Sequence, residues 1–298
     1  MGKKQLTIFT PVYNRAKKIK NLYQSLVKQT NHNYIWMIVD DGSKDNIDDV
    51  VSDFINENKI EIQYYKQENQ GKHVAHNLGV SKCKTDYFAC VDSDDTLLSN
   101  AIEDILDYIK DNEQVLMTES ISGVLSYKGY SSDEKVGKYP DSTEPASLTE
   151  LYQKKGMTGD TFLIFKTDII RKFPFPVFAG EKFLRESISY DLMDKEYKYV
   201  ILGEILYLCE YFDDGLTKNA SRLELKSPKG AALFRKHEAE KAQRRKDKIR
   251  NLIAYVFFSK LGHNTKECRH FLGVRYFFYW PLSFSGYIKY SRIMQEDR

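Results

Sequence analysis

The sequence predicts an α/β fold with a mainly parallel central sheet and a helical C-terminal extension. In the N-terminal third, apolar runs of strand length alternate with stretches of helical apolar spacing, which is typical of doubly wound proteins. A polar loop follows each of three predicted strands, at the position where such sheets bind ligands. The chain of 298 residues, 42% of them hydrophobic, is long enough for one large or two ordinary domains.

The elements follow one another regularly. Pro11 is expected to end the first strand, and the spacing of Leu22, Leu26 and Val27 predicts the buried face of the first helix. We expect a main domain over residues 1–222, with halves 1–96 and 97–222, and a separate region over 223–298. Further strands are predicted at 35–39, 60–66, 87–91, 115–118, 123–127, 161–165 and 199–207, helices at 48–56, 74–80, 100–110, 147–153 and 187–197, a mobile loop at 128–147, and one or two helices over 223–258.

Several functional classes are disfavoured by the composition. No run of about 18 apolar residues occurs, so no transmembrane helix is expected. The N-terminus enters a strand without the apolar core of a signal peptide. The four cysteines lack metal-binding or redox spacing. Together these features predict a cytoplasmic protein.

Charge is distributed unevenly. Residues 1–225 hold 28 Lys and Arg against 36 Asp and Glu, whereas residues 226–250 hold ten against three. Aromatic residues mixed with Arg275 and Lys289 follow at 271–290. One interpretation is helices packed on the body with a solvated basic face. The other is contact of residues 226–290 with an anionic membrane surface. Nucleic acid is the weaker alternative, because no known binding module is visible.

The clearest chemical signal follows the strand at 87–91, where Asp92, Asp94 and Asp95 occur within four positions. Clustered carboxylates repel one another unless a cation lies among them. Asp92 and Asp94 can both reach one divalent ion, and their oxygen atoms suit Mg²⁺ or Mn²⁺. The alternative is a solvated turn in which an aspartate caps the next helix.

Two further loops offer groups for a nucleoside. Thr10, Pro11 and Tyr13 supply backbone, ring and hydroxyl groups for a base and a ribose, and Asp40 or Asp41 can accept a hydrogen bond from either. A turn with an N-cap is the alternative for the Asp40–Ser43 loop. Lys72 enters a predicted helix and forms a weak phosphate site there. Neither a classical dinucleotide motif nor a P-loop motif occurs.

The order and spacing of four motifs resemble those of family 2 glycosyltransferases: residues 10–15 (TPVYNR), 39–43 (VDDGS), 69–79 (NQGKHVAHNLG) and 91–95 (VDSDD). The resemblance implies a GT-A fold, a nucleotide-sugar donor that is usually a UDP-sugar, Mn²⁺ or Mg²⁺, and inversion at the anomeric carbon. It assigns the nucleotide sugar to residues 1–96 and the acceptor to residues 97–222. His76 departs from the family, in which arginine is common, and we expect it to be partly exposed. The residues that the resemblance assigns to the donor are Thr10, Pro11, Tyr13, Asp40 or Asp41, Asn69 and Asp92, with Asp92 and Asp94 on the metal. We add Lys72 and Ser93 to the predicted donor-binding residues.

The general base is predicted from the same resemblance. Glu186 stands where relatives carry an acidic pair at a helix start, although the second acid is replaced by Ser187. Glu181 and Asp191 are the alternatives, and a charge near the helix cap is the structural interpretation of Glu186. Two weaker predictions are an acceptor contact for Asp160 and a closing loop over residues 210–217.

Three functional hypotheses result. The first is an inverting, metal-dependent glycosyltransferase that builds a bacterial surface polysaccharide, such as a capsule, on a glycan or lipid-linked glycan acceptor, working in the cytoplasm or peripherally on the inner face of the membrane. The second is a nucleotide-sugar-binding scaffold with impaired catalysis, suggested by Ser187. The third is a nucleotidyltransferase, which normally needs a glycine-rich basic loop after the first strand, and residues 10–15 contain no glycine.

Overall fold

The computed structural model describes residues 4–141, 143–209 and 216–296. The chain divides into two compact units. Met1–Pro174 and Ser189–Tyr211 form the first unit, and Phe175–Ile188 and Phe212–Arg298 form the second. Residues 175–188 and 216–222 therefore group with the C-terminal helices rather than with the sheet.

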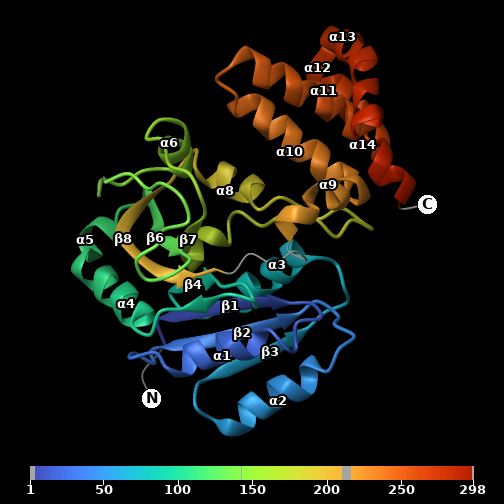
Figure 1. Cartoon of the computed structure of the whole chain (residues 1–298). Coiled ribbons are helices and arrows are strands. Elements are labelled where there is room, and N and C mark those ends of the chain that lie inside the picture. The colour runs from blue at the N-terminus through green and yellow to red at the C-terminus, as the bar shows by residue number, and fades with distance from the viewer. Residues whose placement is uncertain (1–3, 142, 210–215, 297–298) are drawn as a thin grey trace. The chain divides into compact units, whose positions relative to one another are not determined.

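The first unit is built on an eight-stranded sheet in the order β3-β2-β1-β4-β7-β6-β8-β5 (Figure 1). The strands β3, β2, β1 and β4 are parallel, whereas β7 runs antiparallel to its neighbours β4 and β6. This confirms the predicted α/β fold. The strands are β1 (Leu6–Val12), β2 (Tyr34–Asp40), β3 (Ile62–Lys66), β4 (Tyr87–Cys90), β5 (Thr96–Leu97), β6 (Ile121–Gly129), β7 (Thr161–Lys166) and β8 (Lys198–Leu208).

Side chains of alternate residues in β1 and β2 enter two different cores, as the two-residue period of a strand requires. Helices α1, α2 and α4 supply the core on one face, and helix α3 contributes to the core on the other. Covering both faces explains why both strands are buried along their whole length. The helices of this unit are α1 (Ile19–Val27), α2 (Ile47–Glu57), α3 (Lys72–Lys82), α4 (Ala101–Asp111), α5 (Glu113–Leu116), α6 (Leu148–Gln153), α7 (Thr167–Ile170) and α8 (Ser187–Met193), whose first two residues group with the second unit.

Close packing fixes the helices on the sheet. On one face the rings of Tyr23 and Phe54 stack at 3.9 Å between centroids, next to Trp36 of β2. On the other face α3 approaches β1 so closely that a Cβ on Gly79 would lie 2.5 Å from the ring of Phe9. The loops at the carboxyl ends of the strands are therefore anchored to a rigid frame.

The prediction that Pro11 ends the first strand is wrong, because β1 continues to Val12 and Pro11 pairs with Val39. In a strand, the N–H and C=O of one residue point to the same side, and those of Val12 point to β2. Pro11 therefore faces the β4 side, where pairing has already stopped at Phe9 and Cys90. Its missing N–H costs no ladder hydrogen bond.

Two other predicted elements differ from the structure. The segment predicted as a strand at 115–118 lies mostly in the short helix α5 and its end, because Glu113 and Gln114 favour helix and Leu116 alone of its residues is buried. The region predicted as one or two helices over 223–258 contains parts of three. Pro228 starts a new helix after Ser227, and Ala242 is extended.

The second unit is a bundle of helices around its own core. Helices α10 and α11 pack along each other, with small residues of α10 such as Ala231 and Ala232 facing Val256 and Phe257 of α11. No helix in the described ranges is long and apolar enough to cross a bilayer. The helices are α9 (Leu216–Lys226), α10 (Pro228–Lys241), α11 (Arg245–Leu261), α12 (Thr265–Leu272), the 3-10 helix η1 (Gly273–Arg275), α13 (Tyr276–Leu282) and α14 (Phe284–Glu296).

Candidate active site

Three loops meet where the adjacent strands β2, β1 and β4 end. The backbone N–H of Asp41 donates to Val12 O at 2.8 Å, and the N–H of Val91 donates to Phe9 O at the same distance. These bonds extend the ladders just beyond the strands. They bring together the residues after Val12, the Asp40–Ser43 loop and the Asp92–Asp95 loop, as the sequence predicted.

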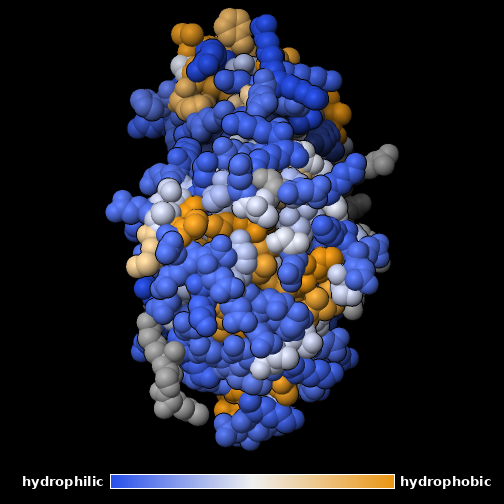
Figure 2. Space-filling model, turned by 90° about the vertical axis from the view of Figure 1, so that its left-hand side faces the viewer, coloured by the Kyte–Doolittle hydropathy of each residue, from blue (hydrophilic) through white to orange (hydrophobic). Residues whose placement is uncertain are grey.

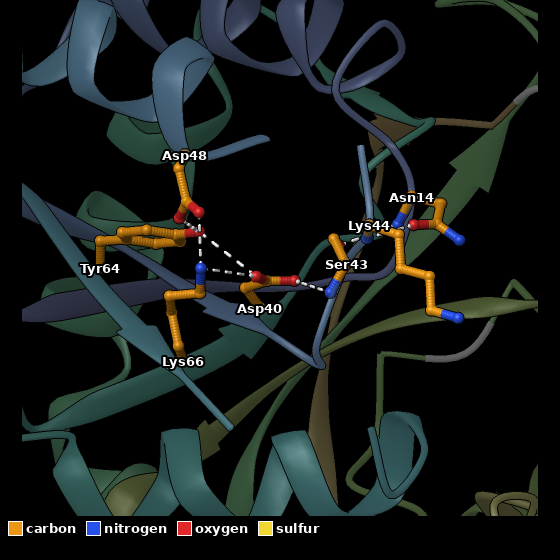
Figure 3. A network of polar contacts seen from close by, with 7 residues as sticks. All are labelled: Asn14, Asp40, Ser43, Lys44, Asp48, Tyr64 and Lys66. Carbon is orange, nitrogen blue, oxygen red and sulfur yellow. Dashed lines mark hydrogen bonds and ion pairs between the residues drawn. The ribbon is translucent and has the colours of Figure 1, made fainter. Parts of the chain in front are cut away.

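Asp40 lies in a polar network between the first two loops (Figure 3). Its Oδ1 accepts from the N–H of Ser43 at 2.9 Å, and its Oδ2 lies 3.4 Å from the hydroxyl of Tyr64. Lys66 Nζ lies 3.8 Å from the same oxygen and 2.5 Å from Asp48. Asp40 is fully buried and therefore shapes the loop after β2 from inside.

Asp41 holds a different segment. Its carboxylate accepts from Gln67 Nε2 at 2.7 Å, from Gln70 N at 2.8 Å and from Gly71 N at 2.8 Å. Gly71, at φ +99°, is the N-cap of α3, so Asp41 occupies the anion position at the start of this helix. These contacts give Asp41 a structural role, and the prediction that Asp40 or Asp41 binds the donor stays a prediction.

Asp92 and Asp94 each lie next to a lysine. Lys72 Nζ is 2.6 Å from Asp92 Oδ1, and Lys18 Nζ is 3.9 Å from Asp94 Oδ2. Burial alone would raise the pKa of Asp92, but the charges of Lys72, Lys128 and Arg15 outweigh it, so the pKa lies below its ordinary value. Asp92 therefore stays ionised in an environment with an excess of positive charge.

Tyr207 of β8 anchors the same loop and was not foreseen from the sequence. Its buried hydroxyl donates to Asp95 Oδ2 at 2.5 Å and accepts from the N–H of Asp92 at 3.1 Å. Lys128 Nζ lies 3.9 Å from the centroid of the Tyr207 ring. These partners come from β6 and β8, more than 30 residues from the acidic loop in sequence, and no local pattern could have linked them.

The remaining donor-binding predictions are placed as follows. Thr10 is fully buried, and its hydroxyl accepts from Trp36 Nε1 at 3.0 Å, so this side chain belongs to the core. Tyr13 is 43% exposed at the end of β1. Asn69 packs against the loop after β2, where a Cβ on Gly42 would lie 2.8 Å from its backbone nitrogen. Ser93 is buried between the two acids of its loop.

The two histidines of α3 are both buried. His76 is 5% exposed, which corrects the expectation of partial exposure, and its ring packs edge-on against Phe9 and Phe88. Burial lowers the pKa of His76 to about 3, so this side chain is neutral near pH 7. Burial also lowers the pKa of His73, whose Nδ1 has no hydrogen-bond partner among the described residues.

The residues predicted for the acceptor side are divided between the units. Glu186 lies half-buried directly before α8, in the second unit, and Asp191 lies within α8 in the first. Glu181 accepts from the N–H groups of Lys229 at 2.8 Å and Gly230 at 2.8 Å, which gives it a structural role at the start of α10. Asp160 is exposed. The predicted closing loop at 210–217 lies almost entirely outside the described residues.

A divalent ion fits the donor set of the acidic loop. In the described ranges, no three His, Cys, Asp or Glu side chains gather as a metal site. Mg²⁺ and similar ions are commonly bound by one or two carboxylates together with substrate phosphates. Asp92 and Asp94, which lie next to the ammonium groups of Lys72 and Lys18, would supply the protein's ligands to such an ion.

A family model described as "Glycosyl transferase family 2" matches residues 7–175, which include all three loops. The chain belongs to glycosyl transferase family 2. This glycosyltransferase is 25% identical over 223 residues to glycosyltransferase GlyG of Streptococcus pneumoniae, an alignment that covers 68% of this chain and 69% of GlyG. It spans only about a fifth of the length of the Rickettsia glycosyltransferases that it matches.

Solved structures confirm the GT-A fold of this family 2 glycosyltransferase. TarS 1–349 of S. aureus in complex with UDP-GlcNAc superimposes with a TM-score of 0.61 at 17% identity, covering 86% of this chain and 72% of TarS. A mannosyltransferase of Pyrobaculum calidifontis in complex with GDP-Man and Mn²⁺ gives a TM-score of 0.54 at 13% identity, covering 98% and 76%. At these identities the likeness extends to the fold alone.

Proposed function

We propose that this chain is an inverting, metal-dependent glycosyltransferase that moves a sugar from a nucleotide sugar, a UDP-sugar by preference, to a hydroxyl of a glycan. The observation that carries the proposal is the charge arrangement at the end of β4. Two carboxylates suited to a divalent ion lie among lysines at distances of 2.6 Å and 3.9 Å. The negative charges of a diphosphate complement the lysines, and the positive charge of a metal ion complements the carboxylates.

Each side chain proposed to bind the nucleotide sugar is assigned one task. When bound, Mn²⁺ or Mg²⁺ held by Asp92 and Asp94 would neutralise charge on the leaving diphosphate as a Lewis acid. Lys72, at the start of α3, releases Asp92 and pairs with a phosphate oxygen. Tyr13 is exposed at the edge of the loop and stacks on the base, while Asp40 and Asn69 line the neighbouring loops.

The acceptor hydroxyl must lose a proton to a carboxylate as it attacks the anomeric carbon. We assign this base to Glu186. Glu181 already holds two backbone N–H groups of α10 at 2.8 Å, which occupies both of its oxygens. Asp191 remains the alternative base, and Asp160 the proposed acceptor contact.

The test compares Glu186→Gln with Asp191→Asn and Glu181→Gln. Glu186→Gln should reduce the transfer rate by roughly a thousandfold, which is within the range of general-base catalysis, and leave UDP affinity unchanged. Asp191→Asn should keep most of the rate. Transfer by Glu186→Gln at the wild-type rate would reject the assignment. Donor binding without any sugar transfer by the wild type would favour the impaired scaffold instead.

The acceptor is proposed to be a glycan or a lipid-linked glycan of a bacterial surface polysaccharide, modified on the cytoplasmic face of the membrane. The polysaccharide context is supported by the family resemblance, and the lipid link by the basic, aromatic C-terminal region. A nucleotidyltransferase is disfavoured because the loop after β1 contains Asn14 at φ +54° but no glycine-rich phosphate cradle.

A further inference from the structure

The C-terminal unit exposes an apolar face that its own helices leave uncovered. Val274, Phe277 and Phe278 are 76%, 73% and 73% exposed, and Leu282 and Ile288 are 51% and 79% exposed. Large apolar side chains are seldom gathered on the surface of a soluble protein unless they contact something. In Figure 2, hydrophobic side chains lie beside strongly hydrophilic ones on the C-terminal unit.

The exposed residues lie on one side of a continuous segment. Positions 274, 277, 278 and 282 follow the spacing of a single helical face, while Tyr276 is buried on the opposite side against the unit's core. The helix α13 therefore exposes apolar side chains on one side and buries Tyr276 on the other. Phe284 and Tyr287, 48% and 37% exposed, extend the apolar surface onto α14.

Along the segment itself the charged residues have one sign. From Cys268 to Gln295 the sequence contains no Asp or Glu, but it contains four Lys and Arg residues, Arg269, Arg275, Lys289 and Arg292. Lys260 of α11 lies among the exposed rings, with its Nζ 4.0 Å from the Phe284 centroid and 5.1 Å from the Trp280 centroid. Cations next to aromatic rings, in a segment without acidic residues, suit a partner that has an apolar interior and anionic groups at its surface.

We propose that η1, α13 and the first turns of α14 form the membrane-docking surface of this chain, and that an anionic lipid bilayer is the partner. Phe277, Phe278 and Leu282 insert into the boundary between head groups and acyl chains, Trp280 lies at head-group level, and Arg275 and Lys289 pair with lipid phosphates. No crossing of the bilayer is involved. A second copy of the chain is the less suitable occupant, because it would place basic groups face to face.

The proposal deepens the proposed function by naming the partner that would present a lipid-linked acceptor. The sequence alone predicted membrane contact anywhere over residues 226–290. The proposal differs because it assigns insertion into the bilayer to residues 274–288. Binding to lipid requires neither donor nor metal. Its failure is therefore distinguishable from failure of the transferase assignment, which is measured by UDP binding.

The test is co-sedimentation of the full chain with vesicles of phosphatidylcholine containing roughly one third phosphatidylglycerol, compared with pure phosphatidylcholine. The variant Phe277→Ser/Phe278→Ser removes the two most prominent rings. Met117→Ser is the matched control, because Met117 is 77% exposed in the first unit. Circular dichroism and UDP affinity check that each variant is folded.

Tryptophan fluorescence gives a second readout. The chain has two tryptophans, of which Trp36 is fully buried in the core and Trp280 is 42% exposed. Vesicles should shift the emission of Trp280 to shorter wavelength, and brominated lipids should quench it. Trp280→Phe should remove both responses while leaving sedimentation largely intact.

The proposal predicts that wild type and Met117→Ser sediment with anionic vesicles and release at high salt, and that the double variant binds at least tenfold more weakly. Arg275→Glu/Lys289→Glu should also weaken binding. The proposal is overturned if wild type stays in the supernatant at low salt, or if the double variant binds like wild type. Self-association that the double variant abolishes, without vesicle binding, would equally overturn it.

Discussion

Replacing Tyr207 by phenylalanine tests how the acidic loop is held in place. The substitution removes one hydroxyl from a fully buried side chain and keeps the ring that packs against Phe162 and faces Lys128. Two hydrogen bonds are lost, one to the carboxylate of Asp95 at 2.5 Å and one from the N–H of Asp92 at 3.1 Å. The change is therefore confined to the anchor of the loop.

The cost can be estimated from the two bonds. A buried hydrogen bond to a charged group contributes about 1.5–3 kcal/mol and a neutral one about 1 kcal/mol. Tyr207→Phe should thus lower the free energy of unfolding by about 3 kcal/mol. Because Asp92 moves with its N–H, we also expect the affinity for Mn²⁺ and UDP to fall about tenfold, which corresponds to about 1.4 kcal/mol.

Urea unfolding and calorimetric UDP titration in Mn²⁺ measure the two effects. Tyr199→Phe is the matched control, because Tyr199 is also a fully buried residue of β8 but its hydroxyl contacts Met193 Sδ at 3.5 Å rather than the acidic loop. If Tyr207→Phe proves no more destabilising than Tyr199→Phe and binds UDP equally well, the loop does not depend on this anchor.

Three further outcomes are expected. Asp41→Ala leaves the N–H of Gly71 and two other donors without their acceptor and should cost about 3–5 kcal/mol in urea unfolding, and a loss below 1 kcal/mol would contradict the structural role. His76 has a pKa of about 3 when folded, so as the pH falls below 6.5 the unfolded chain takes up the proton first and stability decreases. Between pH 7 and 4.5 His76 should therefore lower the free energy of unfolding by about 2.5 kcal/mol. In His76→Leu the drop in the free energy of unfolding between these two pH values should be smaller by the same amount. Glu181→Gln weakens the two bonds to the start of α10 and should cost about 1–2 kcal/mol in unfolding without slowing transfer, so a normal stability with a lost rate would make Glu181 the base.

Short-range patterns were sufficient to predict the parallel strands β1, β2 and β4 and the loops that follow them. These strands are mostly apolar, and each is followed by residues with turn or capping character, so both the strands and their polar ends are visible locally. The Asp92–Asp95 loop was predicted for the same reason. The family match then confirmed the family that the order of these loops indicated.

The sequence could not show which residues far apart along the chain contact one another in the fold. The structural role of Asp41 depends on Gly71, which lies thirty residues later and donates its N–H to the Asp41 carboxylate. The burial of His76 depends on Phe9 and Phe88 from two strands. Glu181 resembled a base in sequence, but its partner Gly230 lies 49 residues later. Tertiary packing decided each of these cases.

The central claim is that the carboxylates of Asp92 and Asp94 hold a divalent ion against a bound diphosphate. Calorimetric titration of UDP into the full chain, in Mn²⁺ and in EDTA, tests it most directly, with Asp94→Asn as the comparison. We expect Mn²⁺ to tighten UDP binding at least tenfold in wild type and Asp94→Asn to lose this gain while remaining folded. Equal UDP affinity with and without the metal in both proteins would show that no ion links these carboxylates to the diphosphate.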